Sequence, residues 1–387
     1  MREAVIVSGS RTPVGKAKKG SFASVRPDDL AAITVKETLK RANNYDGPID
    51  DVIIGCAMPE AEQGMNMARN IVALSGLPYT TPAITINRYC SSGLQSIVDA
   101  TYRIQSGAAK TIIAGGAESM TMVPMGGHVI RPNVRIMEEM PEYYMTMGNT
   151  AEQVAREFQV SRQAQDEFAV WSHQKAAKAL AEGKFKEEIV PVPVTLYTPN
   201  GEKNIEVTTD EGVRPDTTVE GLQKLRPAFH IQGSVTAGNA SQMSDGAASV
   251  LVMDREVAEA EGLKPLAKLR SFAVAGVRPE IMGIGPVEAI PKALQLASLQ
   301  LEDIDLIELN EAFASQSVQI MRALQLEEEK LNVNGGAIAL GHPLGCTGTK
   351  LTVSLIHEMK RRQSQFGIVT MCIGGGMGAC GVFELLL

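Results

Sequence analysis

Three short segments decide the fold: Ile86–Gly93 (INRYCSSG), Gly335–Gly348 (GGAIALGHPLGCTG) and Thr370–Gly381 (TMCIGGGMGACG). Each segment reads as a β-branched or apolar strand that runs into a glycine-rich turn. Each turn carries one reactive side chain, and these are Cys90, His342 and Cys372. Glycine lets the backbone approach a ligand closely, and an imidazole can activate a thiol as a nucleophile. The three segments therefore predict an enzyme of acyl-thioester chemistry.

The composition is that of an ordinary globular chain. Its 387 residues are 44% hydrophobic and 21% charged, which suits two or three domains' worth of structure and is unlike a disordered chain. The formal net charge of −7 argues against a nucleic-acid surface and against a basic membrane patch. It leaves room for an anionic ligand that a few local cations would hold.

The five cysteines have no CxxC spacing and fit neither a disulfide framework nor a zinc ribbon. Free thiols are typical of a reducing compartment, and residues 1–9 run straight into a short strand, so we expect a cytoplasmic protein. We expect no metal site, because Pro343 keeps His342 and Cys346 off one helical face and no third ligand is near. The glycines of the uncharged stretch Gly367–Phe383 favour two strands and a turn over a membrane span.

Similar β/α units recur along the chain at a nearly constant offset. The landmark pairs, with their offsets in residues, are Ile54 and Leu309 (255), Cys90 and Cys346 (256), and Gly115-Gly116 and Gly374-Gly375 (259). This pattern predicts a duplication, in which Val333–Leu340 is a strand before Cys346 and Gly115-Gly116 is a packing turn. Chance similarity between generic β/α units is the alternative.

Alternating strands and helices predict sheets that helices cover on both faces. We expect an N-terminal half of residues 1–117 plus about 247–267, and a C-terminal half of residues 268–387. The stretch between them, 118–246, is rich in turn residues and reads as an inserted loop domain with one clear helix, Ser161–Glu182. Ser161 would cap that helix and Gly183 would follow its end. Seven methionines between Met120 and Met147 suit either an adaptable pocket or ordinary gap-filling.

Cys90 follows a strand and begins a helix, so its sulfur would lie at the positive helix end, which lowers the pKa of a thiol. His342 precedes Pro343, which disfavours helix at position 342 and favours a loop that holds the imidazole as a base. The glycine run after Cys372 can direct backbone N–H groups at one oxygen, as an oxyanion hole does. A structural role is the alternative for Cys90 and for His342, and the glycine run after Cys372 is only a weak nucleotide-binding signature.

Asn310 and Glu311 form a polar pair at the end of the apolar strand 304–309. Two interpretations remain open for this pair. It either caps a following helix, Ala312–Leu326, or holds a water molecule in the active site.

The segments described above together resemble the thiolase family over the whole chain. The resemblance rests on four blocks in the family's order: Asn87–Gly93, Asn310–Phe313, Gly341–Pro343 and Cys372–Gly376. It is closest to the degradative 3-ketoacyl-CoA thiolases (acetyl-CoA acyltransferases) of fatty-acid β-oxidation. It implies an α/β fold of five layers, α-β-α-β-α, made of two duplicated halves with an inserted loop domain. It also implies a homodimer or homotetramer, and coenzyme A as a co-substrate rather than a permanently bound cofactor.

The same resemblance implies roles for nine residues. The catalytic set would be Cys90, His342, Cys372, Asn310 and Gly374. The set that contacts substrate or CoA would be Arg214, Ser241, Met147 and Phe313.

Other activities remain as alternatives. An acetoacetyl-CoA-forming biosynthetic thiolase is one, although many of those carry histidine where this chain has Thr146. A ketoacyl synthase of the same fold would not place a second catalytic cysteine at Cys372. A noncatalytic acyl-CoA-binding protein should have lost at least one of the three reactive side chains, and none is lost.

Overall fold

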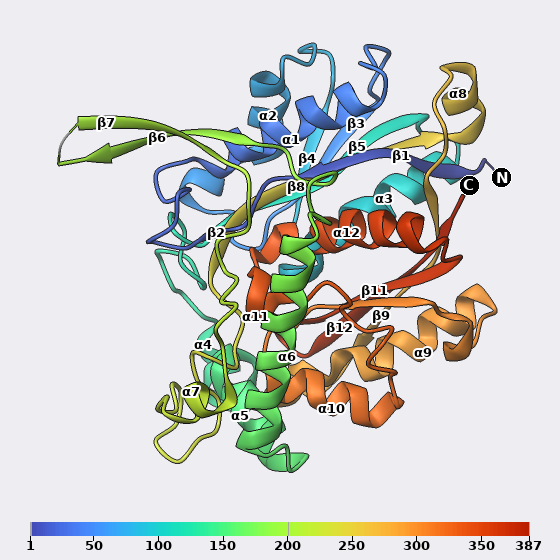
Figure 1. Cartoon of the computed structure of the whole chain (residues 1–387). Coiled ribbons are helices and arrows are strands. Elements are labelled where there is room, and N and C mark those ends of the chain that lie inside the picture. Colours follow the sequence, from blue (N-terminus) through green and yellow to red (C-terminus); the bar gives the residue numbers. More distant parts are fainter. Residues whose placement is uncertain (1, 200, 387) are drawn as a thin grey trace.

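The computed structural model describes residues 2–199 and 201–386 (Figure 1). Its main sheet has ten strands, in the order β10-β11-β12-β9-β1-β8-β5-β3-β4 with β2 beside β8. One group of strands is β1 (Ala4–Arg11), β2 (Gly15–Lys16), β3 (Asp51–Gly55), β4 (Ala83–Ile86), β5 (Thr111–Ser119) and β8 (Ser244–Asp254). The other is β9 (Ala267–Gly276), β10 (Leu306–Leu309), β11 (Phe366–Ile373) and β12 (Met377–Leu385). The two groups join through one registered pair, Ile6 with Ala267, so each half of the chain has its own sheet.

Three layers of helices enclose these two sheets. On the outer face of the first sheet lie α1 (Pro27–Arg41) and α2 (Met67–Ser75), and on the outer face of the second lie α9 (Gly285–Ala297) and α10 (Ala314–Leu324). Between the sheets lie α3 (Ser92–Gln105) and α12 (Thr347–Arg362), whose apolar side chains share one core with both sheets. The expected order α-β-α-β-α is therefore confirmed, and the central helices are buried on two sides.

The two central helices begin in the same way. Cys90 lies in a 3₁₀ turn, η2 (Tyr89–Ser91), directly before α3, and Cys346 lies in another, η6 (Leu344–Cys346), directly before α12. Each cysteine thus stands at the entrance to one helix of the middle layer, in agreement with the predicted duplication of two related halves.

Two details of the predicted duplication are wrong. Val333–Leu340 is not a strand, because Ala337–Leu340 forms a short helix, α11, and the residues before it are irregular. Gly115-Gly116 is not a turn, because both residues lie inside β5. A β-carbon on Gly116 would come within 2.1 Å of the carbonyl oxygen of Gly345, so this glycine permits a close approach between the halves.

The segment between β5 and β8 holds more structure than the single expected helix. Its elements are α4 (Val134–Glu139), η3 (Pro141–Tyr144), α5 (Met147–Glu157), α6 (Arg162–Ala181), β6 (Val192–Thr198), β7 (Gly201–Val207) and α7 (Val219–Gln223). The hairpin β6–β7 extends away from the body at the left of Figure 1. The predicted ends of α6 are confirmed, since Ser161 Oγ accepts from Ala164 N at 3.1 Å and Gly183 follows with φ of 71°.

The remaining elements are η1 (Ala61–Gln63), α8 (Arg255–Ala260), η4 (Pro279–Ile284) and η5 (Leu301–Asp303). Among the described residues, no helix combines the length and apolar character that crossing a bilayer requires. Within the same ranges, no three His, Cys, Asp or Glu side chains are grouped so that they would hold a metal ion.

Candidate active site

Cys90 is presented by the 3₁₀ turn η2, at the end of the loop that follows β4. Its side chain is half-buried and packs against the apolar cluster of Ala57, Met120 and Leu344. Leu344 is only two residues beyond His342, so the nucleophile loop and the imidazole loop lie against each other. Tyr89, directly before Cys90, adopts a φ of 44°, a conformation in which non-glycine residues are uncommon.

The pKa of Cys90 differs from the sequence-based expectation. Burial, followed by the charge interaction with Cys372, raises the pKa of the Cys90 thiol, while the backbone N–H groups of Gly374 and Cys90 lower it in part. The start of α3 does supply amides, but the loss of hydration outweighs them. Cys90 is therefore a protonated thiol in the resting site and needs a base to become a nucleophile.

His342 lies 4% exposed in the loop between α11 and α12, and both its ring nitrogens have partners. Nδ1 is 2.6 Å from Thr347 Oγ1, and that hydroxyl donates its proton to the carbonyl oxygen of Pro343 at 2.9 Å. Because a hydroxyl has one proton, Thr347 must accept from Nδ1–H. The lone pair is therefore on Nε2, which lies 3.3 Å from Asn310 Nδ2.

The surroundings of His342 favour its neutral form. Burial, and then the positive charge of Lys350, lowers the pKa of His342 to about 3. The imidazole is therefore uncharged near neutral pH and can accept a proton on Nε2.

Cys372 is the second buried thiol of the site, near the end of β11 and 1% exposed. Burial raises the pKa of Cys372 to about 11, so this thiol is also protonated at rest. Its Sγ donates to Gln316 Oε1 at 3.3 Å. Gln316 was not among the predicted site residues, and its only sequence signal is that it follows the Asn310–Phe313 block by one helical turn.

Gly374 begins the tight turn between β11 and β12, which pair up to Ile373 and Met377. Gly375 and Gly376 adopt φ of 80° and 86°, which glycine allows without strain. The backbone N–H of Gly374 lowers the pKa of Cys90 in part, so this turn lies close to the Cys90 sulfur. A β-carbon on Gly374 would lie 3.6 Å from Met147 Sδ, which places Met147 beside this turn.

Asn310 is fully buried, and among the described residues its Oδ1 has no hydrogen-bond partner. The interpretation of Asn310 and Glu311 as a helix cap is wrong. The residue before α10 is Phe313, and no side chain caps that helix. Glu311 accepts from Ser172 Oγ at 2.6 Å, and also from Asn332 and Ile338. Asn310 and Glu311 therefore have different partners. Asn310 contacts His342, while Glu311 binds Asn332 and Ile338 in the segment before the imidazole loop.

Met147 and Phe313 belong to the same apolar cluster as Cys372. Phe313 also meets Phe229 edge-on, with ring centroids 6.1 Å apart. Ser241 lies at the edge of this cluster, where its N–H donates to the carbonyl oxygen of Ala312 at 2.9 Å. These contacts form an apolar surface beside Cys372.

Arg214 is the predicted residue that the structure does not bring into the cluster. It is exposed, and its backbone N–H donates to His173 Nδ1 at 3.1 Å. Within the described ranges, no hydrogen bond or ion pair joins its guanidinium to the residues around Cys90.

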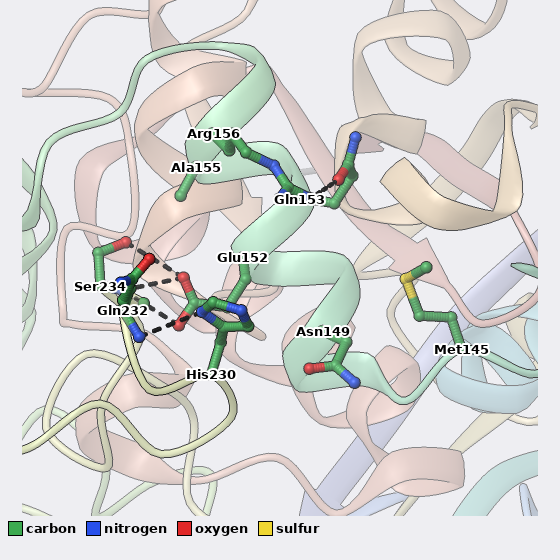
Figure 2. Close-up of a pocket in the computed structure, with 10 residues that line it drawn as sticks. Met145, Asn149, Glu152, Gln153, Ala155, Arg156, His230, Gln232 and Ser234 are labelled. Atoms are coloured by element: carbon green, nitrogen blue, oxygen red, sulfur yellow. Dashed lines mark hydrogen bonds between the residues drawn. The ribbon is translucent and has the colours of Figure 1, made fainter.

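Helix α5 separates this site from a neighbouring cavity of about 520 Å³. Figure 2 shows the cavity, which is lined by Met145, Asn149, Glu152, Gln153, Ala155, Arg156, His230, Gln232, Gly233 and Ser234. Glu152, on α5, accepts from the N–H groups of Ser234 and Val235, both at 2.9 Å. These hydrogen bonds hold the loop that contains Ser234 and Val235 against α5. Since Met147 and Ala151 face the Cys372 cluster, the cavity is not the place where the thiols meet.

Comparisons with known proteins agree along the whole chain. Residues 4–256 match the thiolase N-terminal domain, and residues 263–385 match the thiolase C-terminal domain. The chain is 72% identical to a 3-ketoacyl-CoA thiolase of Bacillus subtilis over 100% of both sequences. It is 47% identical to the peroxisomal 3-ketoacyl-CoA thiolase 1 of Arabidopsis thaliana, over 99% of this chain and 87% of that one.

Two solved structures superpose on all of this chain and on 99% of their own, each with a TM-score of 0.90. They are the acetyl-CoA acetyltransferase of Bacillus anthracis, 40% identical, and the human mitochondrial 3-ketoacyl-CoA thiolase, 37% identical. Sequence, fold and the arrangement of the three reactive side chains lead to one conclusion: the chain belongs to the thiolase family.

Proposed function

We propose that the chain is a degradative 3-ketoacyl-CoA thiolase, an acyltransferase that cleaves 3-ketoacyl-CoA with free CoA. The products would be acetyl-CoA and an acyl-CoA shortened by two carbons. The observation that carries this proposal is one buried neighbourhood of two protonated thiols and a neutral imidazole, whose Nε2 carries the lone pair and lies opposite Asn310 Nδ2. The names of relatives that match the full chain support the same activity.

In the first step, Nε2 of His342 takes the proton of Cys90, and the sulfur attacks the 3-keto carbon of the substrate. Negative charge then develops on the former keto oxygen. The N–H groups of Cys90 and Gly374, which already lie near the sulfur, are placed to receive it. An oxyanion donor of this kind is worth about 10²–10³ in rate.

In the second step, the bond between carbons 2 and 3 breaks, which leaves an acyl group on Cys90 and the enolate of acetyl-CoA. Cys372 gives its proton to carbon 2, which completes acetyl-CoA. The enolate oxygen would be stabilised by His342 and by a water molecule held on Asn310. The partnerless Oδ1 of Asn310 supports this role, because a buried amide oxygen requires a donor.

In the last step, the Cys372 thiolate removes the proton of an incoming CoA thiol. The CoA sulfur attacks the acyl group, and Cys90 leaves as a thiolate that recovers its proton from His342. Cys90 thus recovers its own proton, while the proton of CoA replaces the one that Cys372 gave to carbon 2, so the enzyme returns to its starting state without an oxidant. Exchange between two thioesters is close to isoenergetic, which suits a cysteine nucleophile.

We also propose that the inserted residues, 118–246, bind the acyl chain and CoA together with Phe313 of the C-terminal half. Met147 of the insert and Phe313 supply an apolar surface beside Cys372, Ser241 lies at its edge, and Arg214 is an exposed cation that can meet a phosphate from solution. The two halves flanking the insert would be 1–117 plus about 247–267, and 268–387. A homodimer or homotetramer in the cytoplasm is proposed from the family resemblance.

The second candidate activity is formation of acetoacetyl-CoA from two acetyl-CoA. The solved acetyl-CoA acetyltransferase that superposes on this chain favours keeping it. The two activities separate in one kinetic experiment. Thiolysis rates are measured for acetoacetyl-CoA and for a long-chain 3-ketoacyl-CoA, each with free CoA. We expect kcat/KM to be higher with the longer substrate, whereas activity on acetoacetyl-CoA alone would favour the biosynthetic candidate.

The roles of the two thiols are tested by half-reactions. Cys90→Ala should form no acyl adduct with acetyl-CoA in mass spectrometry. Cys372→Ala should still acylate Cys90 but fail to exchange the methyl protons of acetyl-CoA with solvent. Cys380→Ala is the matched control, since Cys380 is buried in β12 outside this cluster. Absence of any adduct in the unmodified enzyme would contradict the proposed function.

A further inference from the structure

Gln316 is a fully buried side chain whose two amide atoms both contact the site. Its Oε1 accepts from the Cys372 thiol at 3.3 Å, and its Nε2 donates to the carbonyl oxygen of Asn310 at 3.2 Å. The residue lies on α10, a helix that otherwise packs into the outer core of the second sheet. A buried polar side chain in this position is retained at a cost in desolvation, which points to a role beyond packing.

The orientation of this amide is fixed by its surroundings. The carbonyl of Asn310 can only accept, so it requires the NH₂ group of Gln316 and turns Oε1 toward the sulfur. On another side, a β-carbon on Gly283 would lie 2.9 Å from Gln316 Cβ and 3.4 Å from Oε1. Gly283, in η4, therefore leaves the space that this side chain occupies.

The contacts join the two proton-carrying groups of the site into one buried chain. Cys372 bonds to Gln316, Gln316 to the backbone of Asn310, and the side chain of Asn310 to Nε2 of His342. Gln316 is the only link in this chain that the proposed chemistry leaves without a task.

We propose that Gln316 is a positioning residue that holds the Cys372 thiol in place for proton transfer to and from carbon 2 of the substrate. This inference rests on the proposed function and adds to it a role for Gln316. Among the described residues, no hydrogen bond joins Gln316 to the nucleophile Cys90, since its amide bonds to Cys372 and to the carbonyl of Asn310. Its loss should therefore affect the half-reaction that uses Cys372 and spare the acylation of Cys90.

The test replaces Gln316 with methionine, which keeps the length and the volume of the side chain but has no amide. Two rates are measured on the full-length enzyme: acetylation of Cys90 by acetyl-CoA in mass spectrometry, and exchange of the acetyl-CoA methyl protons with D₂O in NMR. We expect exchange to fall about tenfold or more and acetylation to change less than about twofold. Gln319→Met is the matched control, because Gln319 lies on the same helix but is half-exposed. It should leave both rates unchanged.

A second variant distinguishes a specific effect on Cys372 from a general loss of structure. Gly283→Ala leaves the amide in place but presses on Gln316, so it should lower exchange more than acetylation as well. Equal loss of both rates in Gln316→Met would mean a structural role and would overturn the inference, and so would two unchanged rates. An unmodified enzyme that forms no adduct at Cys90 would instead overturn the proposed function itself.

Discussion

Thr347 determines which nitrogen of His342 carries the proton. Its hydroxyl donates to the carbonyl of Pro343 at 2.9 Å, so it can only accept from Nδ1, 2.6 Å away. Both partners lie on one short stretch of chain, in which Pro343 precedes η6 and Thr347 begins α12. The start of a helix in the middle layer thus sets the tautomer of the proposed base.

Replacing Thr347 with valine should weaken the base without removing it. Valine keeps the shape of threonine but cannot accept from Nδ1, so the imidazole loses its fixed tautomer and orientation. We expect kcat for thiolysis to fall about tenfold, part of the 10²–10⁴ that general base catalysis supplies. Steady-state assays check this. Thr347→Ser, which keeps the hydroxyl, should stay within about threefold, and equal losses in both variants would contradict the tautomer argument.

The acid limb of the pH profile should lie well below that of an ordinary histidine. Because burial and Lys350 lower the pKa of His342 to about 3, the base remains neutral as the pH falls through 6.5. We therefore expect kcat/KM to hold between pH 5 and pH 7. An acid limb near pH 6.5 in the unmodified enzyme would contradict this prediction.

Lys350→Met tests how much the charge of Lys350 contributes to the low pKa of His342. Lys350 is 2% exposed and shares its surroundings with Arg11, Asp210, Glu308 and Glu188, and its charge also lowers the pKa of Cys346 in part. Loss of its positive charge should raise the pKa of His342 and move the acid limb of kcat/KM to higher pH. The melting temperature, measured in parallel, separates this shift from loss of the fold.

The two glycines after Ile373 should respond differently to a methyl group. At Gly374 the nearest atoms to a new β-carbon are Met147 Sδ at 3.6 Å and Tyr89 Cδ2 at 3.9 Å, so Gly374→Ala should fold normally yet add a methyl group between Met147 and the loop of Cys90, and slow thiolysis. Gly375 has a φ of 80°, and Gly375→Ala should lose about 1–2 kcal/mol of unfolding free energy, although nothing obstructs its β-carbon. Urea denaturation and thiolysis assays of both variants check the contrast. The reverse pattern would contradict it.

Arg11 should be a large contributor to stability. It is 1% exposed in β1 and pairs with Glu188 at 2.7 Å and with Asp210 at 2.8 Å, both in the inserted segment. Arg11→Met would remove the ion-pair partner of two buried carboxylates, which keep only hydrogen bonds from Val14 N and Ser354 Oγ and the more distant charge of Lys350, and we expect a loss of about 3–5 kcal/mol of unfolding free energy. Arg135→Met breaks an exposed pair with Glu139 and should change less than about 0.5 kcal/mol. Similar losses in urea denaturation would contradict the assigned difference.

Features that depend on neighbours in the sequence were predictable. Ser161 and Gly183 bound α6 because a cap and a left-handed glycine act within one helical turn. The turn at Gly374–Gly376 follows from three consecutive glycines between two apolar runs. The order of the four family blocks was enough to anticipate the five layers.

Features that depend on distant partners were not predictable. The segment before His342 resembles a strand in composition, but Glu311 and Ser172 satisfy its backbone N–H groups, so it needs no neighbouring strand. The pKa of Cys90 was predicted from its own helix, yet the packing of other segments around the thiol reverses the direction. Gln316 had only a weak signal, its place one turn after the Asn310–Phe313 block, because its importance depends on the contact with the distant Cys372.

Because Gly116 has no side chain, the contact between the two halves leaves no room for an added atom at this position. No side chain lies between Gly116 of β5 and the carbonyl oxygen of Gly345, so their direct contact sets the distance between the two halves. One methyl group there would lie 2.1 Å from that oxygen and would push the halves apart by about 1.4 Å, since non-bonded atoms separate to about 3.5 Å. Sulfur and imidazole come from opposite sides of that seam, so the alignment of the reaction depends on a residue that has no side chain.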